Sequence, residues 1–172
     1  MKKYLRLSII VLALSSVVFL GTAAKGVIKD TGSGGGAGVI TLADLDITDV
    51  GTLPSSRWYF FKEWGHGFER LFTFNPVKKA ELELRISNEK AAEALLVSEE
   101  KPDDAEALAT ALDNYAKAQE RLEARIAKLK ENSENPSIEK LLEKLNEQTL
   151  RHADLLGQLA ERFDTDLYSE DA

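Results

Sequence analysis

The sequence contains no cysteine among its 172 residues. This absence excludes disulfide bonds, thiolate metal ligands, a cysteine nucleophile and a lipidated N-terminal cysteine. Only two histidines and one methionine are present, so histidine-rich and methionine-rich clusters that bind metals are absent as well. The stability of the folded part must therefore come from the packing of its secondary structure.

Basic residues are outnumbered by acidic ones. After Ala24 the chain keeps 19 of its 22 basic residues and all 29 acidic residues, a formal charge of −10. Binding to nucleic acid and tight binding to anionic lipid headgroups both rely on clustered lysine and arginine. We therefore expect no nucleic-acid partner.

Motifs of known catalytic chemistry are also missing. The chain has no phosphate-binding P-loop, no GxSxG nucleophile elbow and no HExxH metal motif. Glu63 and His66 are three residues apart, but a metal site in a helical bundle needs further ligands from other helices. We predict that the protein is not an enzyme, and we predict no catalytic residues, no cofactor and no metal site.

Residues 1–24 have the pattern of an export signal. Basic residues precede an uncharged apolar stretch, Leu7–Leu20, and small residues follow up to Ala24. The apolar stretch is short for a membrane span of about 20 residues. A cleaved signal peptide is favoured, with an uncleaved signal anchor as the alternative. Both predict an exported, extracytoplasmic protein, either secreted or anchored to the outer face of the cytoplasmic membrane.

Residues 25–52 are predicted to form a Gly-rich flexible linker, because residues 31–38 consist almost entirely of glycine and other small residues. Three aspartates follow at positions 44, 46 and 49 and raise the question of calcium. The central glycine and terminal glutamate of a calcium loop are missing, so a solvated strand or loop is favoured.

Residues 53–74 are predicted to contain an aromatic helix. Its apolar residues recur at spacings of three and four and form one stripe. A stripe of this size needs to be covered, and three partners are open: the protein's own bundle, which is favoured, a membrane interface or a groove in a partner protein. The candidate interaction residues are Trp58, Phe61, Trp64, Phe68 and Phe72.

Residues 75–163 are predicted to form the main domain. Asn75-Pro76 and Asn135-Pro136 are helix start signals, and Pro102 interrupts the chain between them. We expect helices over 76–97, 103–131 and 136–163, followed by a disordered acidic tail over 164–172. Because short loops favour antiparallel neighbours, the predicted fold is all-α, an antiparallel three-helix bundle in up-down-up order.

The apolar residues of the three helices alternate in steps of four and three, as in a coiled-coil seam. Antiparallel pairing brings the polar seam positions together in the middle of the bundle. Such a layer would mainly control the register of the helices, while a small ligand or proton site around Tyr115 and His152 is the alternative. The predicted layer consists of Ser87, Tyr115, Gln119, Thr149 and His152.

The segments Leu53-Pro54-Ser55-Ser56, Tyr59-Phe60-Phe61-Lys62 and Phe72 to Leu82 carry a resemblance. Over about residues 41–162 the chain resembles a bacterial family of helical domains of unknown function, found in exported or membrane-tethered proteins. The chain departs from the family pattern at Asn75, where Asp is common, and at Arg57-Trp58. The resemblance implies an extracytoplasmic helical domain and supplies no catalytic residues.

Two functions are compatible with these sequence features. The first is a non-enzymatic interaction or scaffold protein of the cell envelope, with an unknown protein partner, self-association or a contact with the membrane interface. The second is a periplasmic-type stress adaptor, a helical hairpin that senses metal ions or holds unfolded chains.

Overall fold

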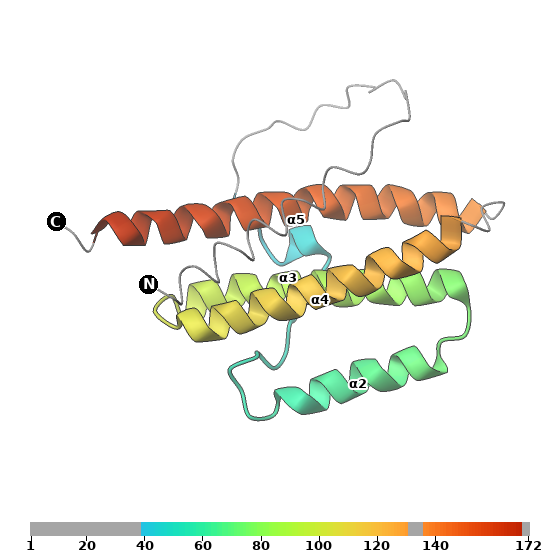
Figure 1. The fold of residues 1–172 in the computed structure, drawn as a ribbon, viewed down its shortest axis with the longest axis horizontal. Helices are drawn as coiled ribbons and strands as arrows, with labels where there is room; N and C mark the ends of the chain where they lie inside the picture. Colours follow the sequence, from blue (N-terminus) through green and yellow to red (C-terminus); the bar gives the residue numbers. More distant parts are fainter. Residues whose placement is uncertain (1–38, 131–135, 170–172) are drawn as a thin grey trace, which may run out of the picture. The chain divides into compact units, whose positions relative to one another are not determined.

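The computed structural model describes residues 39–130 and 136–169 (Figure 1). The predicted export signal, residues 25–38 of the predicted linker, residues 131–135 and the last three residues lie outside the described part. The secondary structure of the described residues is entirely helical, which confirms the all-α class. No helix among them has the length and apolar character needed to cross a membrane. The elements are the short 3-10 helix η2 (Ala43–Leu45) and the helices α2 (Tyr59–Phe72), α3 (Pro76–Glu100), α4 (Ala105–Lys130) and α5 (Pro136–Ser169).

Two of the helices begin with a side-chain cap. The Asn75 side chain accepts hydrogen bonds from the backbone N–H groups of Val77 at 2.9 Å and Lys78 at 3.1 Å. Asp104 accepts one from the backbone N–H of Ala107 at 2.9 Å. Such caps satisfy backbone donors that have no partner within the helix.

The helix ends differ from the prediction. α3 continues to Glu100 instead of ending near residue 97. α5 continues to Ser169, so most of the acidic segment predicted to be a disordered tail is helical. The added turns contain Asp164, Thr165 and Asp166, which are weak helix formers, so local propensity did not predict this extension of α5.

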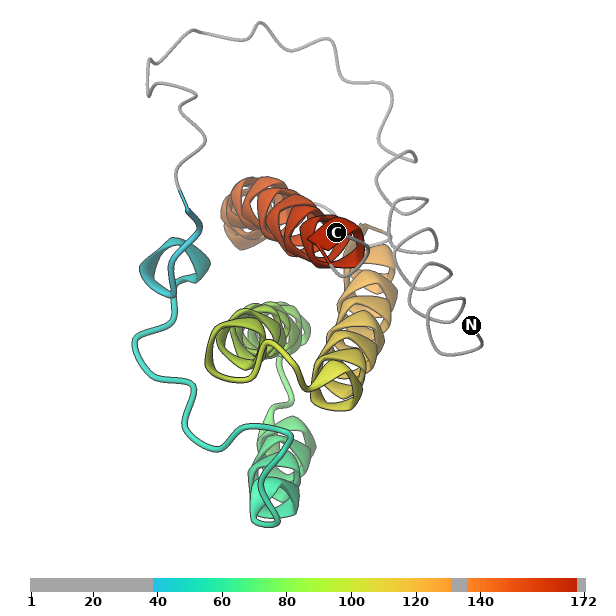
Figure 2. The ribbon, with the colours of Figure 1, turned by 90° about the vertical axis from the view of Figure 1, so that its left-hand side faces the viewer.

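The helices α3, α4 and α5 lie alongside one another (Figures 1 and 2). Their apolar residues meet in one buried cluster, with Leu142 and Leu145 at its margin. The predicted heptad positions of all three helices contribute to it, because steps of four and three keep one side of each helix facing its neighbours. The cluster consists of Val77, Ala80, Leu84, Leu122, Ile126, Leu129, Ile138 and Leu141.

Helix α3 is covered on several sides: Figure 2 shows α2, α4, α5 and the segment around η2 around it. Its apolar side chains pack mainly against α4 and α5, and Leu82 and Ile86 meet Ala118 of α4. Three charged side chains of α3 are also buried, those of Glu83, Lys90 and Glu93. Buried charges require partners, and most of these come from α2.

Part of the predicted flexible linker belongs to the folded domain. Leu45, Ile47 and Val50 are buried, and the backbone N–H of Ile40 donates to the side chain of Gln158 at 3.0 Å. Asp46 pairs with Lys144 of α5 at 2.9 Å. The segment from residue 40 to 50 therefore covers α3 and α5, and the prediction of a linker reaching residue 52 is wrong there. Its apolar residues stand between aspartates, which made the segment resemble a solvated loop.

Candidate functional site

Helix α2 turns Tyr59 and most of its polar residues inward and its tryptophan and phenylalanine residues outward. His66 is its buried residue, at 6% exposure, whereas Trp64 is 64% exposed. With 3.6 residues per turn, the inward and outward sets lie on opposite sides of the helix. The expectation that the aromatic stripe docks on the protein's own bundle is therefore wrong. We call the outward set the aromatic face: Trp58, Phe60, Phe61, Trp64, Phe68, Leu71, Phe72 and Phe74.

The aromatic face is large for a single protein chain. Its side chains are between 48% and 81% exposed. Since one aromatic side chain offers about 150–250 Å², the face presents on the order of 1,000 Å² of mostly apolar surface. The largest apolar patch of a typical monomer covers about 300–600 Å². The aromatic face is therefore a candidate contact surface.

Contacts among the rings give the face a defined surface. The rings of Trp58 and Phe61 stack at a centroid distance of 5.7 Å, and Phe60 meets Trp64 edge-on at 6.3 Å. Gly65 and Gly67 lie within the continuous helix, and a Cβ atom at either would meet nothing within 4 Å. All five predicted interaction residues belong to this face.

The inward side of α2 is held by an ionic cluster centred on Lys90 of α3. The Lys90 ammonium group donates to Glu93 at 2.9 Å, to the Tyr59 hydroxyl at 2.6 Å and to Glu63. The Tyr59 hydroxyl donates in turn to the other oxygen of Glu93 at 2.6 Å. Lys90 and Glu93 are 1% and 0% exposed, and each has several partners, as a buried charge requires. Asn114 of α4 also donates to the Tyr59 hydroxyl at 3.3 Å.

Two further contacts extend this cluster along α2. Lys62 pairs with Glu89 at 2.6 Å and with Glu93 at 2.8 Å, and its ammonium group also donates to the backbone oxygen of Val50. His66 Nε2 lies 3.1 Å from Glu89.

Near the end of α2, Arg70 forms a bidentate pair with Glu83, at 2.9 and 3.1 Å. Planar two-point pairs of this kind combine charge with fixed geometry. We call these side chains the α2–α3 ionic layer. It consists of Tyr59, Lys62, Glu63, His66 and Arg70 of α2 and of Glu83, Glu89, Lys90 and Glu93 of α3.

The ionic layer shifts the pKa values of its members. Burial alone would raise the pKa of Glu89, but hydrogen bonds from His66 and Lys62 lower it to about 2. Burial likewise opposes the hydrogen bond and charge of Lys90, which nevertheless lower the pKa of Glu63. Burial and the nearby Glu93 raise the pKa of Tyr59 above its ordinary value, so its hydroxyl keeps its proton. The layer thus holds ionised carboxylates and a neutral phenol at neutral pH.

The structure brings three of the five residues of the predicted polar layer into contact, namely Tyr115, Gln119 and His152. Gln119 Nε2 donates to the Tyr115 hydroxyl at 2.6 Å and lies 3.0 Å from His152 Nδ1, and the Tyr115 and His152 rings meet edge-on at 5.3 Å. Ser87 of α3 is fully buried. Thr149 is exposed and bonds back to the carbonyl of Leu145, so its assignment to the layer is wrong.

Gln148 is buried at the neighbouring position. A shift by one residue turns a helical side chain by about 100°, which is enough to move the buried position from Thr149 to Gln148. Buried side-chain atoms without a hydrogen-bond partner in the described part of the chain include Ser87 Oγ, Asn88 Oδ1, Gln148 Oε1 and His152 Nε2. Unpaired buried polar atoms are costly, so these atoms offset part of the stability that the hydrogen bonds of the layer supply.

Burial lowers the pKa of His152 to about 4 and raises the pKa of Tyr115 to about 12. Both groups are therefore neutral at pH 7. Because the amide of Gln119 donates to His152 Nδ1, the ring proton of the neutral imidazole belongs on Nε2.

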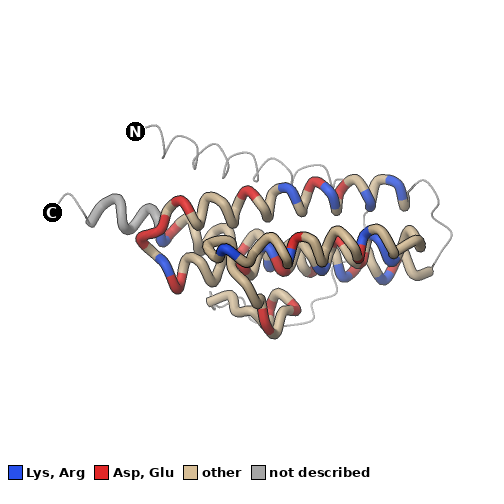
Figure 3. The backbone as a smooth tube through the Cα atoms, turned by 90° about the horizontal axis from the view of Figure 1, so that it is seen from below, with Lys and Arg blue, Asp and Glu red and all other residues tan. Residues whose placement is uncertain are grey.

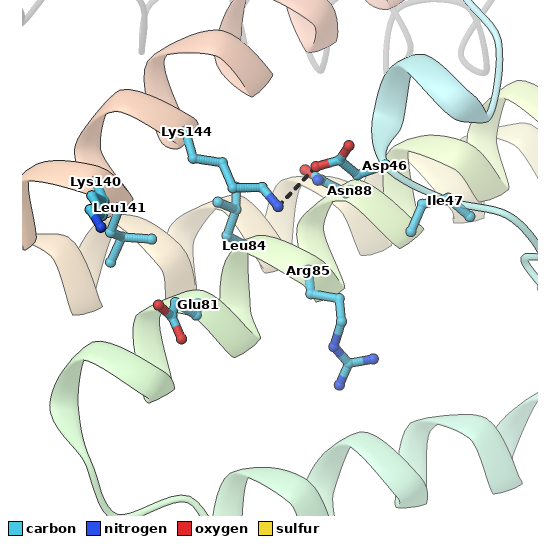
Figure 4. A pocket seen from close by; sticks show the side chains of 9 residues that line it. All are labelled: Asp46, Ile47, Glu81, Leu84, Arg85, Asn88, Lys140, Leu141 and Lys144. Atoms are coloured by element: carbon cyan, nitrogen blue, oxygen red, sulfur yellow. Dashed lines mark ion pairs between the residues drawn. The ribbon is translucent and has the colours of Figure 1, made fainter. Parts of the chain in front are cut away.

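A cavity of about 430 Å³ lies between η2, α3 and α5 (Figure 4). The Lys144–Asp46 ion pair lies across it, and its lining also includes Arg85, Lys140 and Glu81. These groups mix both signs of charge, so the lining favours neither an anion nor a cation.

Charged residues are spread over the helices. Figure 3 shows acidic and basic residues along the helices without a continuous stripe of one sign. Within the described residues, no three histidine, aspartate or glutamate side chains are grouped so that they could hold a metal ion. Glu63 and His66 are 3.8 Å apart at their nearest charged atoms and belong to the ionic layer.

The glutamates and the lysine of α3 in the ionic layer were not identified from the sequence. Glutamate and lysine side chains usually lie on solvated faces, so their burial has no local signal in α3 itself. A signal existed, because the polar residues of α2 at positions 59, 62, 63, 66 and 70 repeat with the spacing of one helical face. That face could have been matched to the charged face of α3.

Comparisons with known proteins identify a family for this chain but no individual relative. No curated protein matches the chain, and no solved structure matches it. One family model matches residues 51–165, which include α2, α3, α4 and most of α5. The chain therefore belongs to the family DUF5667, described as a domain of unknown function.

Proposed function

We propose that this chain is a non-enzymatic, extracytoplasmic interaction module of the cell envelope, and that the aromatic face of α2 is its contact surface. The observation that carries the proposal is the orientation of α2. A protein that needed these aromatic side chains for its own core would turn them inward, because apolar burial is the main driving force of folding. Here the inward side is occupied by the ionic layer.

In this proposal α3, α4 and α5 form an antiparallel up-down-up bundle that serves as a rigid support. The ionic layer fixes α2 on the bundle through directional pairs such as Arg70–Glu83. Contact residues on a rigid element lose little conformational freedom on binding. The export signal predicted for residues 1–24 supports an extracytoplasmic location.

The experiment is photo-crosslinking in cells from a photoreactive residue at position 64, followed by mass spectrometry. Trp64 is 64% exposed, so its replacement leaves the ionic layer intact. We expect adducts with molecules other than the chain itself. The matched control is the same residue at position 150, because Leu150 of α5 is 62% exposed outside the aromatic face. Adducts confined to the same chain, or equal adducts from both positions, would contradict the proposal.

A second function, holding unfolded chains, is supported by the same exposed face. Apolar surface of this size can cover exposed hydrophobic segments of other proteins. It predicts adducts from position 64 with many unrelated proteins and their increase after heat stress. A single reproducible adduct would favour the interaction module instead.

A further inference from the structure

We propose that the aromatic face binds the interface of a lipid bilayer with electrically neutral headgroups. This inference rests on the proposed function, since it names the partner of the same face. In this arrangement α2 lies along the surface of the bilayer and inserts its outward side chains.

The composition of the face fits the membrane–water interface. Both tryptophans of the chain and five of its seven phenylalanines belong to it. Tryptophan is enriched where bilayer and water meet, and surface-bound helices combine such residues with a polar opposite side. The outward positions of the helix span about 120° at 100° per residue. A bilayer takes up a convex apolar face of this kind without a matching pocket.

The charges of α2 fit a neutral apolar partner. Its two glutamates pair with cations of α3, Glu63 with Lys90 and Glu69 with Arg85. Its Lys62 and Arg70 pair with glutamates of α3. Approach to a surface of low dielectric constant therefore removes water from no unpaired charge of the helix, which limits the desolvation cost.

The net charge of the chain selects the kind of bilayer and disfavours a second copy as the occupant. The part after Ala24 has a formal charge of −10. Like charge repels both anionic headgroups and another copy of the same chain. Binding through the aromatic face should therefore be strongest with neutral headgroups and should change little with salt.

The segment before the folded domain would bring the face close to a membrane. About 15 residues separate Ala24 from Ile40, the first residue bonded to the domain. The sequence predicts a Gly-rich linker in this segment, and a random coil of that length has a root-mean-square span of about 20 Å. If the apolar stretch from Leu7 to Leu20 acts as an anchor, the tether holds α2 at high effective concentration beside the bilayer.

The experiment uses the chain's own tryptophans as reporters. Trp58 and Trp64 both lie on the aromatic face, so their emission reports on this face even when another segment anchors the chain. The full chain is mixed with phosphatidylcholine vesicles, with and without bromine atoms in the acyl chains. We expect a shift of the emission to shorter wavelength and strong quenching by the brominated lipid.

Variants make the test specific. Replacing Phe61 and Phe68 together by serine should lower the ratio of docked to undocked protein about tenfold, because two partly inserted rings are lost. Leu150→Ser, at an equally exposed position of α5, should leave the quenching unchanged. Circular dichroism checks that each variant keeps its helix content.

The outcomes separate this inference from the proposed function. Absence of quenching with the intact chain would overturn the bilayer proposal. If a protein adduct still formed from position 64 in cells, the proposed function would stand with a protein partner. A spectral shift that depends on protein concentration without vesicles would point to a second copy. If the experiments showed no quenching and no intermolecular adduct, both proposals would be contradicted.

Discussion

The ammonium group of Lys90 lies 2.9 Å from a carboxylate oxygen of Glu93, and both side chains are shielded from solvent although each is charged. The two residues are one helical turn apart on α3, and α2 encloses them with Tyr59 and Glu63. This pair explains how a helix with an aromatic side can dock with its polar side. A buried ion pair favours a specific geometry more than it favours stability, because removing either partner leaves an unpaired buried charge.

Removal of the cation should loosen α2. We expect Lys90→Met to lower the free energy of unfolding by about 3–5 kcal/mol, because Glu93 and Glu63 lose their shared partner. Urea unfolding followed by circular dichroism measures the change. The control is Lys117→Met, which removes an exposed pair with Asp113 and should cost less than about 1 kcal/mol. Equal effects of the two substitutions would show that the ionic layer does not hold the helix.

The ionic layer should weaken in acid. The pKa of Glu89 is about 2 in the folded protein, below the ordinary value of 4.5. A lowered carboxyl pKa contributes stability that is complete above pH 4.5 and is lost as the pH falls toward 2. The difference in urea midpoint between the natural chain and Glu89→Gln should therefore shrink over this range. A difference that stays constant from pH 6 to pH 3 would contradict the assignment.

The core should respond to pH in a separate window. Burial lowers the pKa of His152 from the ordinary 6.5 to about 4, so the unfolded chain binds a proton first. The stability due to the neutral ring is complete above pH 6.5 and is lost as the pH falls toward 4, by about 1.4 kcal/mol per unit. Nuclear magnetic resonance of the His152 ring should show titration near pH 4. Titration near 6.5 would mean that the ring is hydrated.

Replacement of Gly65 by alanine is expected to increase the stability of α2. No heavy atom lies within 4 Å of a Cβ atom built at Gly65, and the residue sits inside a helix. Gly65→Ala should stabilise α2 by about 0.5–1 kcal/mol, because alanine loses less backbone freedom on folding. Amide hydrogen exchange of α2 measures the change.

The matched control for this substitution is Gly51→Ala. Gly51 has a φ of +67°, a conformation that is costly for alanine, so the substitution should destabilise the chain by about 1 kcal/mol. Amide hydrogen exchange that becomes slower in both variants, or in neither, would contradict the different effects expected at the two glycines.

Several features were predictable because they depend on neighbouring residues. The start of α3 follows from Asn75 and Pro76, since a cap acts within one helical turn. The apolar cluster joining Leu84, Leu122 and Leu129 follows from heptad spacing. Short connections then place successive helices next to each other. Local spacing also brought Tyr115, Gln119 and His152 together, because antiparallel pairing relates their positions by simple counting.

Other features depended on how each helix is turned. Gln148 is buried where the heptad pattern predicted Thr149, a rotation of the helix too small for that pattern to resolve. The segment containing Leu45 and Ile47 packs onto α3 and α5, although aspartates surround it in the sequence. Its burial depends on a space between two helices that no local pattern describes.

The sequence by itself determined the helical class, the helix starts, the apolar seam and the division of α2 into an aromatic and a polar side. Only the tertiary structure decided which side of α2 faces inward. The physical reason is that amphipathic spacing defines two opposite faces but not the surface that each will meet. That choice depended on Glu83, Lys90 and Glu93, buried charges on another helix whose partners α2 supplies.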